Sequence, residues 1–271
     1  MGTSASSKGP GSGPDIPIVP PWVDDDAGVP PGQPPQPPTE MAPAGRWKGV
    51  RTSLGKFGGG DGGGGDRRRH LERGLGHYSR SGMGGSGNAA RRMAGTARTA
   101  GSLYQALNAL ANGQPLPAEF GLQPGALDGR SSEEIVDILV DAIRPIDGTQ
   151  DAEAARDSAA RALSEIVDQG ADLLDLSPQQ IDQVLAAMVG NDVAMRIELD
   201  VGKAVIDKAP SKAAGLDRLQ EMKDYVREVV AVQYAAERAR AGQLDRAGVE
   251  RLTREAIRQT FEVFEVNGGI E

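Results

Sequence analysis

The stretch that decides the fold runs from residue 177 to residue 189 and reads SPQQIDQVLAAMV. Ser177 is a good helix cap, Pro178 suits the first helical position, and Gln180 can complete a capping box. Apolar residues then recur at the spacing of one helix face, at Ile181, Val184, Leu185 and Met188. This pattern predicts an amphipathic helix that ends at Gly190.

The same kind of pattern extends over residues 66–271. A second capping box, Ser131 with Glu134, precedes an apolar face, and Pro145 ends that segment. No segment shows sustained alternation of apolar and polar residues, so we predict an all-α fold, either a helical bundle or an irregular helical array. Helices are expected at about 66–81, 88–111, 131–144, 151–170, 177–190, 191–208, 216–241 and 245–266.

Residues 1–65 have a different composition, rich in Gly and Pro and without helical periodicity. Residues 29–38 (VPPGQPPQPP) are typical of polyproline II, and residues 58–65 (GGGDGGGG) are typical of a flexible hinge. The chain is therefore expected to have a long disordered Gly/Pro-rich N-terminal tail, residues 1–65, followed by a helical domain, residues 66–271.

Two apolar islands interrupt this tail, at residues 16–23 and 47–57. Large aromatic side chains are uncommon in a solvated linker, because they are most stable when buried. We therefore interpret Trp22, Trp47 and Phe57 as candidate partner-docking residues. The alternative that stays open is incidental hydrophobicity within a loop.

The net charge of −8 is unevenly distributed: residues 1–65 carry −1, the basic helices of residues 66–101 carry +6, and the acidic body, residues 102–271, carries −13. A basic block can bind an external polyanion or pack on the acidic body of its own chain. Aromatic stacking partners are scarce nearby and the acidic body repels phosphate, so packing is the favoured interpretation. The candidate polyanion-binding residues are Arg67, Arg68, Arg69, Arg91 and Arg92.

The sequence contains no strong motif for catalysis, metal binding or cofactor binding. The chain has no Cys, which excludes disulfides and thiolate chemistry. Residues 82–87 (GMGGSG) match the dinucleotide-binding pattern but lack the preceding strand. His70 and His77 lack the spacing of a helical zinc site, and no nucleophile motif occurs, so we expect no metal, no cofactor and no enzymatic activity. No membrane-spanning run or signal peptide is evident, which favours the cytoplasm and no membrane role.

The opening MGTSASSKGPGSGPDIPIVPPWVDDD and the later RWKGVRTSLGKF resemble the B component of the Qat antiphage defence system. The Arg/Gly-rich helices and all-helical remainder are also similar to that family. The DDD and PPGQPPQPP stretches are departures from its pattern. The resemblance implies three partners: an ATPase, a QueC-like enzyme related to deazaguanine synthesis, and a TatD-like nuclease.

The resemblance also implies that a QueC-like enzyme modifies the amino terminus of its protein partner, which nominates Gly2 as the modified residue. The expected function is thus a non-enzymatic component of a bacterial antiphage defence complex, whose tail is a docking peptide or a modification substrate. The alternative is a nucleic-acid-binding adaptor that uses residues 67–98.

Overall fold

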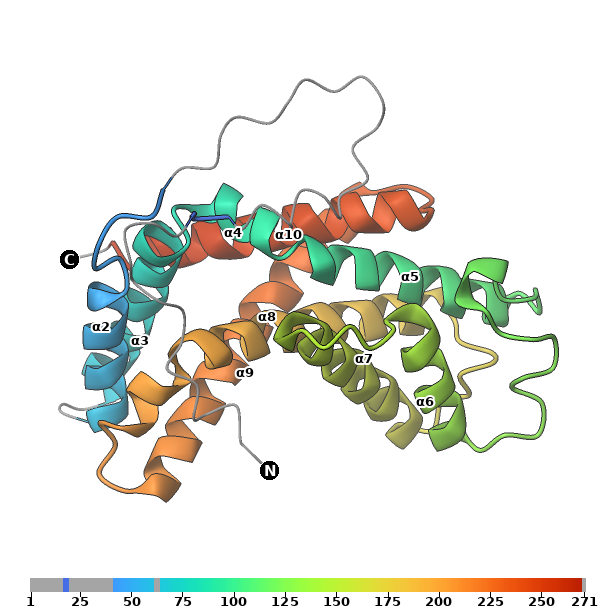
Figure 1. The fold of residues 1–271 in the computed structure, drawn as a ribbon, viewed down its shortest axis with the longest axis horizontal. Coiled ribbons are helices and arrows are strands. Elements are labelled where there is room, and N and C mark those ends of the chain that lie inside the picture. The colour runs from blue at the N-terminus through green and yellow to red at the C-terminus, as the bar shows by residue number, and fades with distance from the viewer. Residues whose placement is uncertain (1–16, 20–40, 61–63, 270–271) are drawn as a thin grey trace, which may run out of the picture.

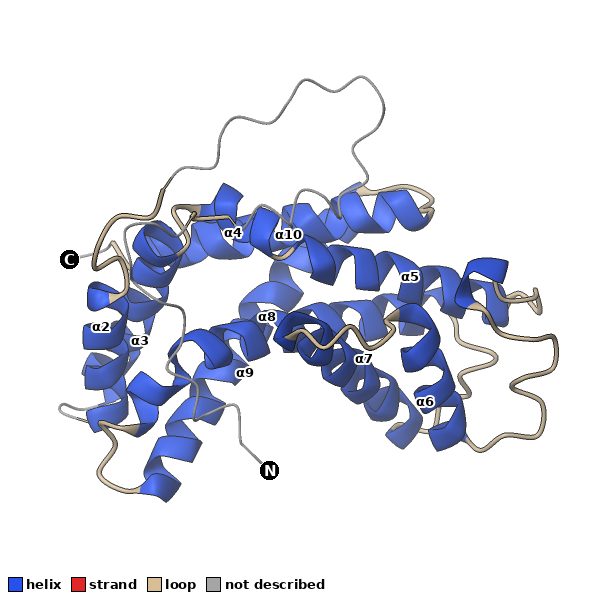
Figure 2. Ribbon diagram, viewed as in Figure 1, coloured by secondary structure: helices blue, strands red, loops and turns tan. Residues whose placement is uncertain are grey.

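The computed structural model describes residues 17–19, 41–60 and 64–269. Within these residues the fold is all-α, as predicted, and the only β pairing is an isolated antiparallel bridge between Pro17 and Met41 (Figure 2). The α-helices are α2 (Lys48–Gly59), α3 (Gly64–His77), α4 (Ser86–Arg92), α5 (Ala94–Ala111), α6 (Ser132–Ile143), α7 (Gln150–Asp168), α8 (Pro178–Ile206), α9 (Lys212–Arg240) and α10 (Arg246–Asn267). A π-turn, η2 (Tyr78–Gly82), and a 3-10 turn, η3 (Ala118–Phe120), complete the helical elements.

Helix starts follow the capping residues of the sequence. Both predicted capping boxes form, with Ser131 and Ser177 accepting hydrogen bonds from the backbone N–H of Glu134 and Gln180. Asp245 caps α10 by accepting a bond of 2.7 Å from the Gly248 N–H. Each cap satisfies a backbone donor that the first turn of a helix leaves without a partner, which fixes where these helices begin.

The predicted break at Gly190 is wrong. Residues 178–206 form one helix of 29 residues, and Gly190 and Asn191 are buried in its middle. A helical glycine costs about 1 kcal/mol relative to alanine. That cost is outweighed because α8 is the central helix of the fold, contacting α7 and α9 along its length and also α2 and α5.

The remaining helices surround α8 (Figure 1). Helix α10 runs beside α5 and α9, α6 packs on α7, and the α2–α3 hairpin lies against α8 and α10. One hydrophobic core connects all these elements, from Trp47 in the first helical segment to Phe264 in the last. The close approach of α2 to α8 requires Gly58, because a Cβ there would lie 2.2 Å from the carbonyl oxygen of Val205.

The predicted boundary between tail and helical domain at residue 65 is wrong, because α2 already belongs to the helical fold. Residues 41–60 belong to the helical fold, and the side chains of Trp47 and Phe57 are 1% and 0% exposed within its core. Both residues are therefore core residues rather than partner-docking residues. The rest of the predicted tail, residues 1–16, 20–40 and 61–63, lies outside the described residues.

Candidate functional site

A short N-terminal segment, residues 17–19, packs on the surface of the helical body. Ile18 and Val19 are 4% and 1% exposed and form a small cluster with Ala42, separate from the main core. Arg92 Nη1 donates a hydrogen bond of 3.0 Å to the backbone carbonyl of Ile18. Part of the predicted island 16–23 thus docks, but it docks on its own chain; we call residues 17–19 the anchor.

The anchor packs on the turn between η2 and α4, which the glycine-rich run builds. Gly84 has φ +74°, and a Cβ on it would lie 2.9 Å from two side-chain carbons of Ile18. A Cβ on Gly82 would lie 2.7 Å from the ring of Trp47. Gly84 thus supplies a left-handed turn, and the missing side chains of both glycines permit close packing.

Helix α10 fixes the same turn from its other side. Glu265 Oε1 accepts hydrogen bonds from Ser79 Oγ at 2.6 Å and from the Ser86 N–H at 2.9 Å. Arg80 Nη1 donates to the Glu265 carbonyl at 3.0 Å. A turn held by this many bonds is a preformed surface; we call residues 78–92, which comprise η2, the turn and α4, the platform.

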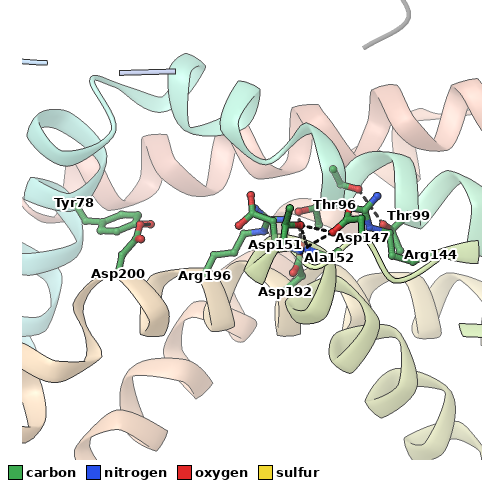
Figure 3. Close-up of polar contacts among 12 residues, drawn as sticks. Tyr78, Thr96, Thr99, Arg144, Asp147, Asp151, Ala152, Asp192, Arg196 and Asp200 are labelled. Atoms are coloured by element: carbon green, nitrogen blue, oxygen red, sulfur yellow. Dashed lines mark hydrogen bonds and ion pairs between the residues drawn. The ribbon is translucent and has the colours of Figure 1, made fainter. Parts of the chain in front are cut away.

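A polar seam lies beneath the platform, between it and α8 (Figure 3). Tyr78 donates a hydrogen bond of 2.8 Å to Asp200 Oδ2. Arg196 forms ion pairs with Asp192 at 3.1 Å and with Asp151 at 2.9 Å. Thr96 also donates to Asp192, so this fully buried carboxylate joins α5 to α8.

Burial sets the electrostatics of the seam. Burial raises the pKa of Asp200 above its usual range, although the bond from Tyr78 lowers it. Burial likewise raises the pKa of the Tyr78 hydroxyl well above its usual range, and Asp200 adds to the rise. Burial lowers the pKa of Arg46, as does the nearby charge of Arg92. These shifts follow from desolvation, which disfavours the charged form of each group.

The seam encloses a cavity of about 70 Å³, lined by the platform, the start of α7 and the middle of α8. Ligand pockets for small molecules and cofactors typically measure about 300–1,000 Å³, so this cavity accommodates a few water molecules rather than a nucleotide. Asp192 and Asp151 are already paired with Arg196, and Asp200 is already bonded to Tyr78. The arrangement suits holding helices and the platform together.

The five predicted polyanion-binding arginines lie in two groups, three near the start of α3 and two at the end of α4. Arg67 Nε lies 3.5 Å from Glu221 of α9, and Arg68 pairs with Glu72 while its guanidinium lies 4.5 Å from the centre of the Tyr225 ring. Arg69 pairs with Asp66 within α3, whereas Arg92 holds the anchor and Arg91 lies half-buried in α4. Arg67 and Arg68 therefore pack on the acidic body, which was the favoured interpretation. Nucleic-acid binding stays an untested prediction.

Of the other predicted site residues, Gly2 and Trp22 lie outside the described residues. The site residues Ile18, Val19 and Gly84 were not predicted as a site from the sequence, and Arg92 was predicted to bind a polyanion rather than the anchor. Ile18 and Val19 did lie in a recognised apolar island, but their receptor is formed by residues far along the chain. No local pattern could have revealed that receptor.

No helix in the described part of the chain has the length and apolar character required to cross a bilayer. No curated protein and no solved structure matches the chain. A family model described as the Qat anti-phage system associated protein QatB matches residues 84–264, about two thirds of the chain. The match covers the helices from α4 to α9 and α10 as far as Phe264, whereas the anchor, η2 and Glu265 lie outside it. The chain therefore belongs to the QatB family of Qat anti-phage system components.

Proposed function

We propose that this chain is a non-enzymatic component of a Qat complex and that it presents its amino terminus to a partner of the same system. Membership of the QatB family supports the proposal that the chain acts within a Qat anti-phage system. The observation that supports the presentation role is the anchor: Arg92 of the platform is bonded to the carbonyl of Ile18, a residue that lies 16 positions after Gly2 in the sequence.

The partner that best suits this role is the QueC-like enzyme implied by the sequence resemblance, and the acceptor is Gly2. Removal of Met1 leaves an α-amine whose pKa is normally about 7.7–8.0, so part of it is neutral and nucleophilic near pH 7. Thr3, Ser4, Ala5 and Ser6 are small and suit a narrow active site.

The proposed reaction uses ordinary carboxylate activation. The partner joins a deazaguanine carboxylate to ATP, which gives an acyl-adenylate and releases pyrophosphate. The Gly2 amine then attacks the acyl carbon, an amide bond forms, AMP leaves, and the amine loses one proton. This chain supplies only the nucleophile and its placement, which is consistent with a seam whose carboxylates are committed to structural partners.

Co-expression with the neighbouring genes tests this function. Intact-mass spectrometry and mapping of the N-terminal peptide should show Gly2 carrying the acid minus one water. The matched control is Gly2→Glu, which blocks removal of Met1 and should carry no adduct. An unmodified Gly2 beside an active partner enzyme, with phage defence intact, would discard the substrate role and leave docking alone.

A further inference from the structure

A groove of about 260 Å³ lies at the end of the molecule opposite the α2–α3 hairpin, between the α5–α6 and α7–α8 connections (Figure 1). Leu174 of the α7–α8 connection is 40% exposed there, and the lining residues Pro115 and Pro124 are exposed as well, so solvent reaches the groove. Burial of an aliphatic surface of this kind against a partner is favourable, because apolar area leaves water. The leucines that line the groove are Leu110, Leu116, Leu122, Leu127 and Leu174.

Both walls of the groove are held in shape by backbone bonds. In the α5–α6 connection, residues 112–131, Gly125 has φ +78° and its carbonyl accepts a bond of 3.0 Å from the Asp128 N–H. In the other wall, Asp172 Oδ1 accepts a bond of 2.9 Å from the Leu174 N–H. Connections longer than about 12–15 residues are uncommon unless they have a function. A preformed groove also loses little entropy when a partner docks.

Carboxylates line and flank the groove. Asp128 is one of the lining residues, and Asp172 and Asp175 stand on either side of Leu174 in the sequence. All three carboxylates are exposed. The groove therefore combines an aliphatic interior with an acidic rim, defined here as Asp128, Asp172 and Asp175. Exposed charges of this kind attract cationic side chains within a Debye length, about 8 Å at physiological ionic strength.

Basic side chains are missing from the segments that form the groove. Residues 112–129 and 162–195 contain no Lys and no Arg. Arg130, which follows the first of these segments, is paired with Glu134 at a distance of 3.1 Å. The segments around the groove thus supply no cation of their own to neutralise the acidic rim, which favours a ligand that brings positive charge.

We propose that this groove docks a basic segment of another protein of the Qat system. An aliphatic side chain of that segment fills the groove, and a neighbouring Lys or Arg contacts the acidic rim. Specific protein interfaces have this arrangement, with apolar contacts at the centre and polar contacts around them. The groove lies within residues 84–264, the part of the chain that the family model matches.

Other occupants fit the groove less well. A second copy of this chain carries the same net charge of −8, so two copies repel each other. Small-molecule pockets typically measure about 300–1,000 Å³, which is more than this groove offers. The inference goes beyond presentation of the amino terminus. It rests on family membership for the system concerned, and it does not require that Gly2 is modified.

Two substitutions of exposed aliphatic residues test the groove in the full chain. Leu174→Asp places a carboxylate in the groove, whereas the control Ile146→Asp places one outside it, at a residue that is 70% exposed. Each variant is titrated against the purified proteins of the neighbouring genes. We expect Leu174→Asp to weaken binding of one of them by about tenfold or more and Ile146→Asp to leave it unchanged. Circular dichroism should show that both variants keep the helical fold. Unchanged binding of every one of these proteins by Leu174→Asp would overturn the inference.

A pair of double variants tests the acidic rim separately. Asp128→Asn combined with Asp175→Asn removes two charges at the groove and should weaken binding about two- to fivefold, with a shallower dependence on salt. Asp217→Asn combined with Glu228→Gln removes two charges from exposed positions of α9 and should leave binding unchanged. Equal losses in the two double variants would show that the attraction is not specific to the groove, and the proposal would fail.

A cross-link identifies the occupant. A photoreactive amino acid replaces Gln123, an exposed lining residue, in the complex of the full chain with its neighbouring proteins. The cross-linked peptide should belong to one of those proteins and contain an aliphatic residue beside Lys or Arg. A cross-link to a second copy of this chain, a peptide without Lys or Arg, or a small molecule retained in native mass spectrometry would each overturn the proposal. None of these readouts depends on Gly2, so failure of docking is distinguishable from failure of the substrate role.

Discussion

Two apolar segments in the Gly/Pro-rich first part of the chain adopt different structures and pack in different parts of the fold. Residues 47–57 become the start of the main core, with Trp47, Leu54 and Phe57 fully or almost fully buried. Residues 17–19 form a short non-helical segment outside the main core, and Arg92 of the platform binds the carbonyl of Ile18. The islands to which they belong, residues 16–23 and 47–57, looked alike by composition, because each combined apolar residues with an aromatic ring in a Gly/Pro-rich part of the chain.

Spacing and proline explain the difference. Trp47, Val50, Leu54 and Phe57 recur at intervals of three, four and three residues, which places them on one face of α2. The island that includes residues 17–19 contains Pro17, Pro20 and Pro21 in its sequence, and proline lacks the backbone donor that a helix interior needs. An apolar segment outside any helix can still be buried, provided that the helical body offers a surface on which it packs.

The largest expected effect is the loss of folding free energy when an aromatic residue of the segment 47–57 is truncated. Trp47→Ala removes a ring that contacts Gly82 and packs 5.6 Å from the ring of Tyr78, so it should lower the free energy of unfolding by about 3–5 kcal/mol. Urea denaturation followed by circular dichroism measures this change.

Lys56→Ala is the matched control, because Lys56 is exposed on the same helix and should change stability by less than about 0.5 kcal/mol. Similar values for the two variants would mean that α2 is not part of the main core.

An intermediate effect is expected at Tyr78, a seam residue whose ring packs against Trp47 and whose hydroxyl is bonded to Asp200. Tyr78→Phe leaves Asp200 without its hydrogen bond, at a cost of about 1–3 kcal/mol near pH 7. Burial already raises the folded-state pKa of Asp200, and loss of the Tyr78 bond raises it further. The native state then binds a proton more tightly than the unfolded chain, so the variant should lose stability as pH rises from about 4 through the raised pKa.

Unfolding curves from pH 4 to pH 8 give this dependence. Adding Asp200→Asn removes the titrating group, and the double variant should lose the extra dependence on pH. A pH slope that persists in the double variant would assign it to another group.

The smallest effect on global stability is expected at the anchor. Burying Ile18 and Val19 contributes about 1.5–3 kcal/mol each. Ordering three residues costs about 1–2 kcal/mol each, a similar total, so the two contributions nearly cancel and the anchor adds little to global stability. Ile18→Ala should therefore lower the free energy of unfolding by no more than about 1 kcal/mol.

The same substitution should have a clear local effect. Hydrogen exchange at residues 17–19 should become much faster in Ile18→Ala, while exchange in α8 stays unchanged. Faster exchange across α8 as well would show that the anchor and the main core unfold together and that the two segments do not differ in kind.

Local sequence signals predicted much of the fold. Caps at Ser131, Ser177 and Asp245 fixed helix starts, because each cap bonds to backbone groups within three residues. The signal for α2 was present in its spacing, but the surrounding glycines favoured a tail. Continuity through Gly190 was not predictable locally, since it depends on the packing of α8 against its neighbours.

The candidate site was less predictable than the fold. The sequence marked residues 16–23 as an apolar island and Arg92 as part of a basic block, without a reason to connect them. The hydrogen bond between Arg92 and the Ile18 carbonyl spans 74 residues of sequence. Similarly, Glu265 reaches the platform from the far end of the chain to bind Ser79.

The sequence by itself determined the helical class, most helix boundaries and the resemblance to the Qat B component, because periodicity, caps and motifs are written within a few residues. Only the tertiary structure decided that Trp47 belongs to the core, that α8 is continuous and that Ile18 has a receptor on its own chain. Each of these outcomes depends on which surfaces meet, and burial free energy is gained only when distant segments exclude water from one another.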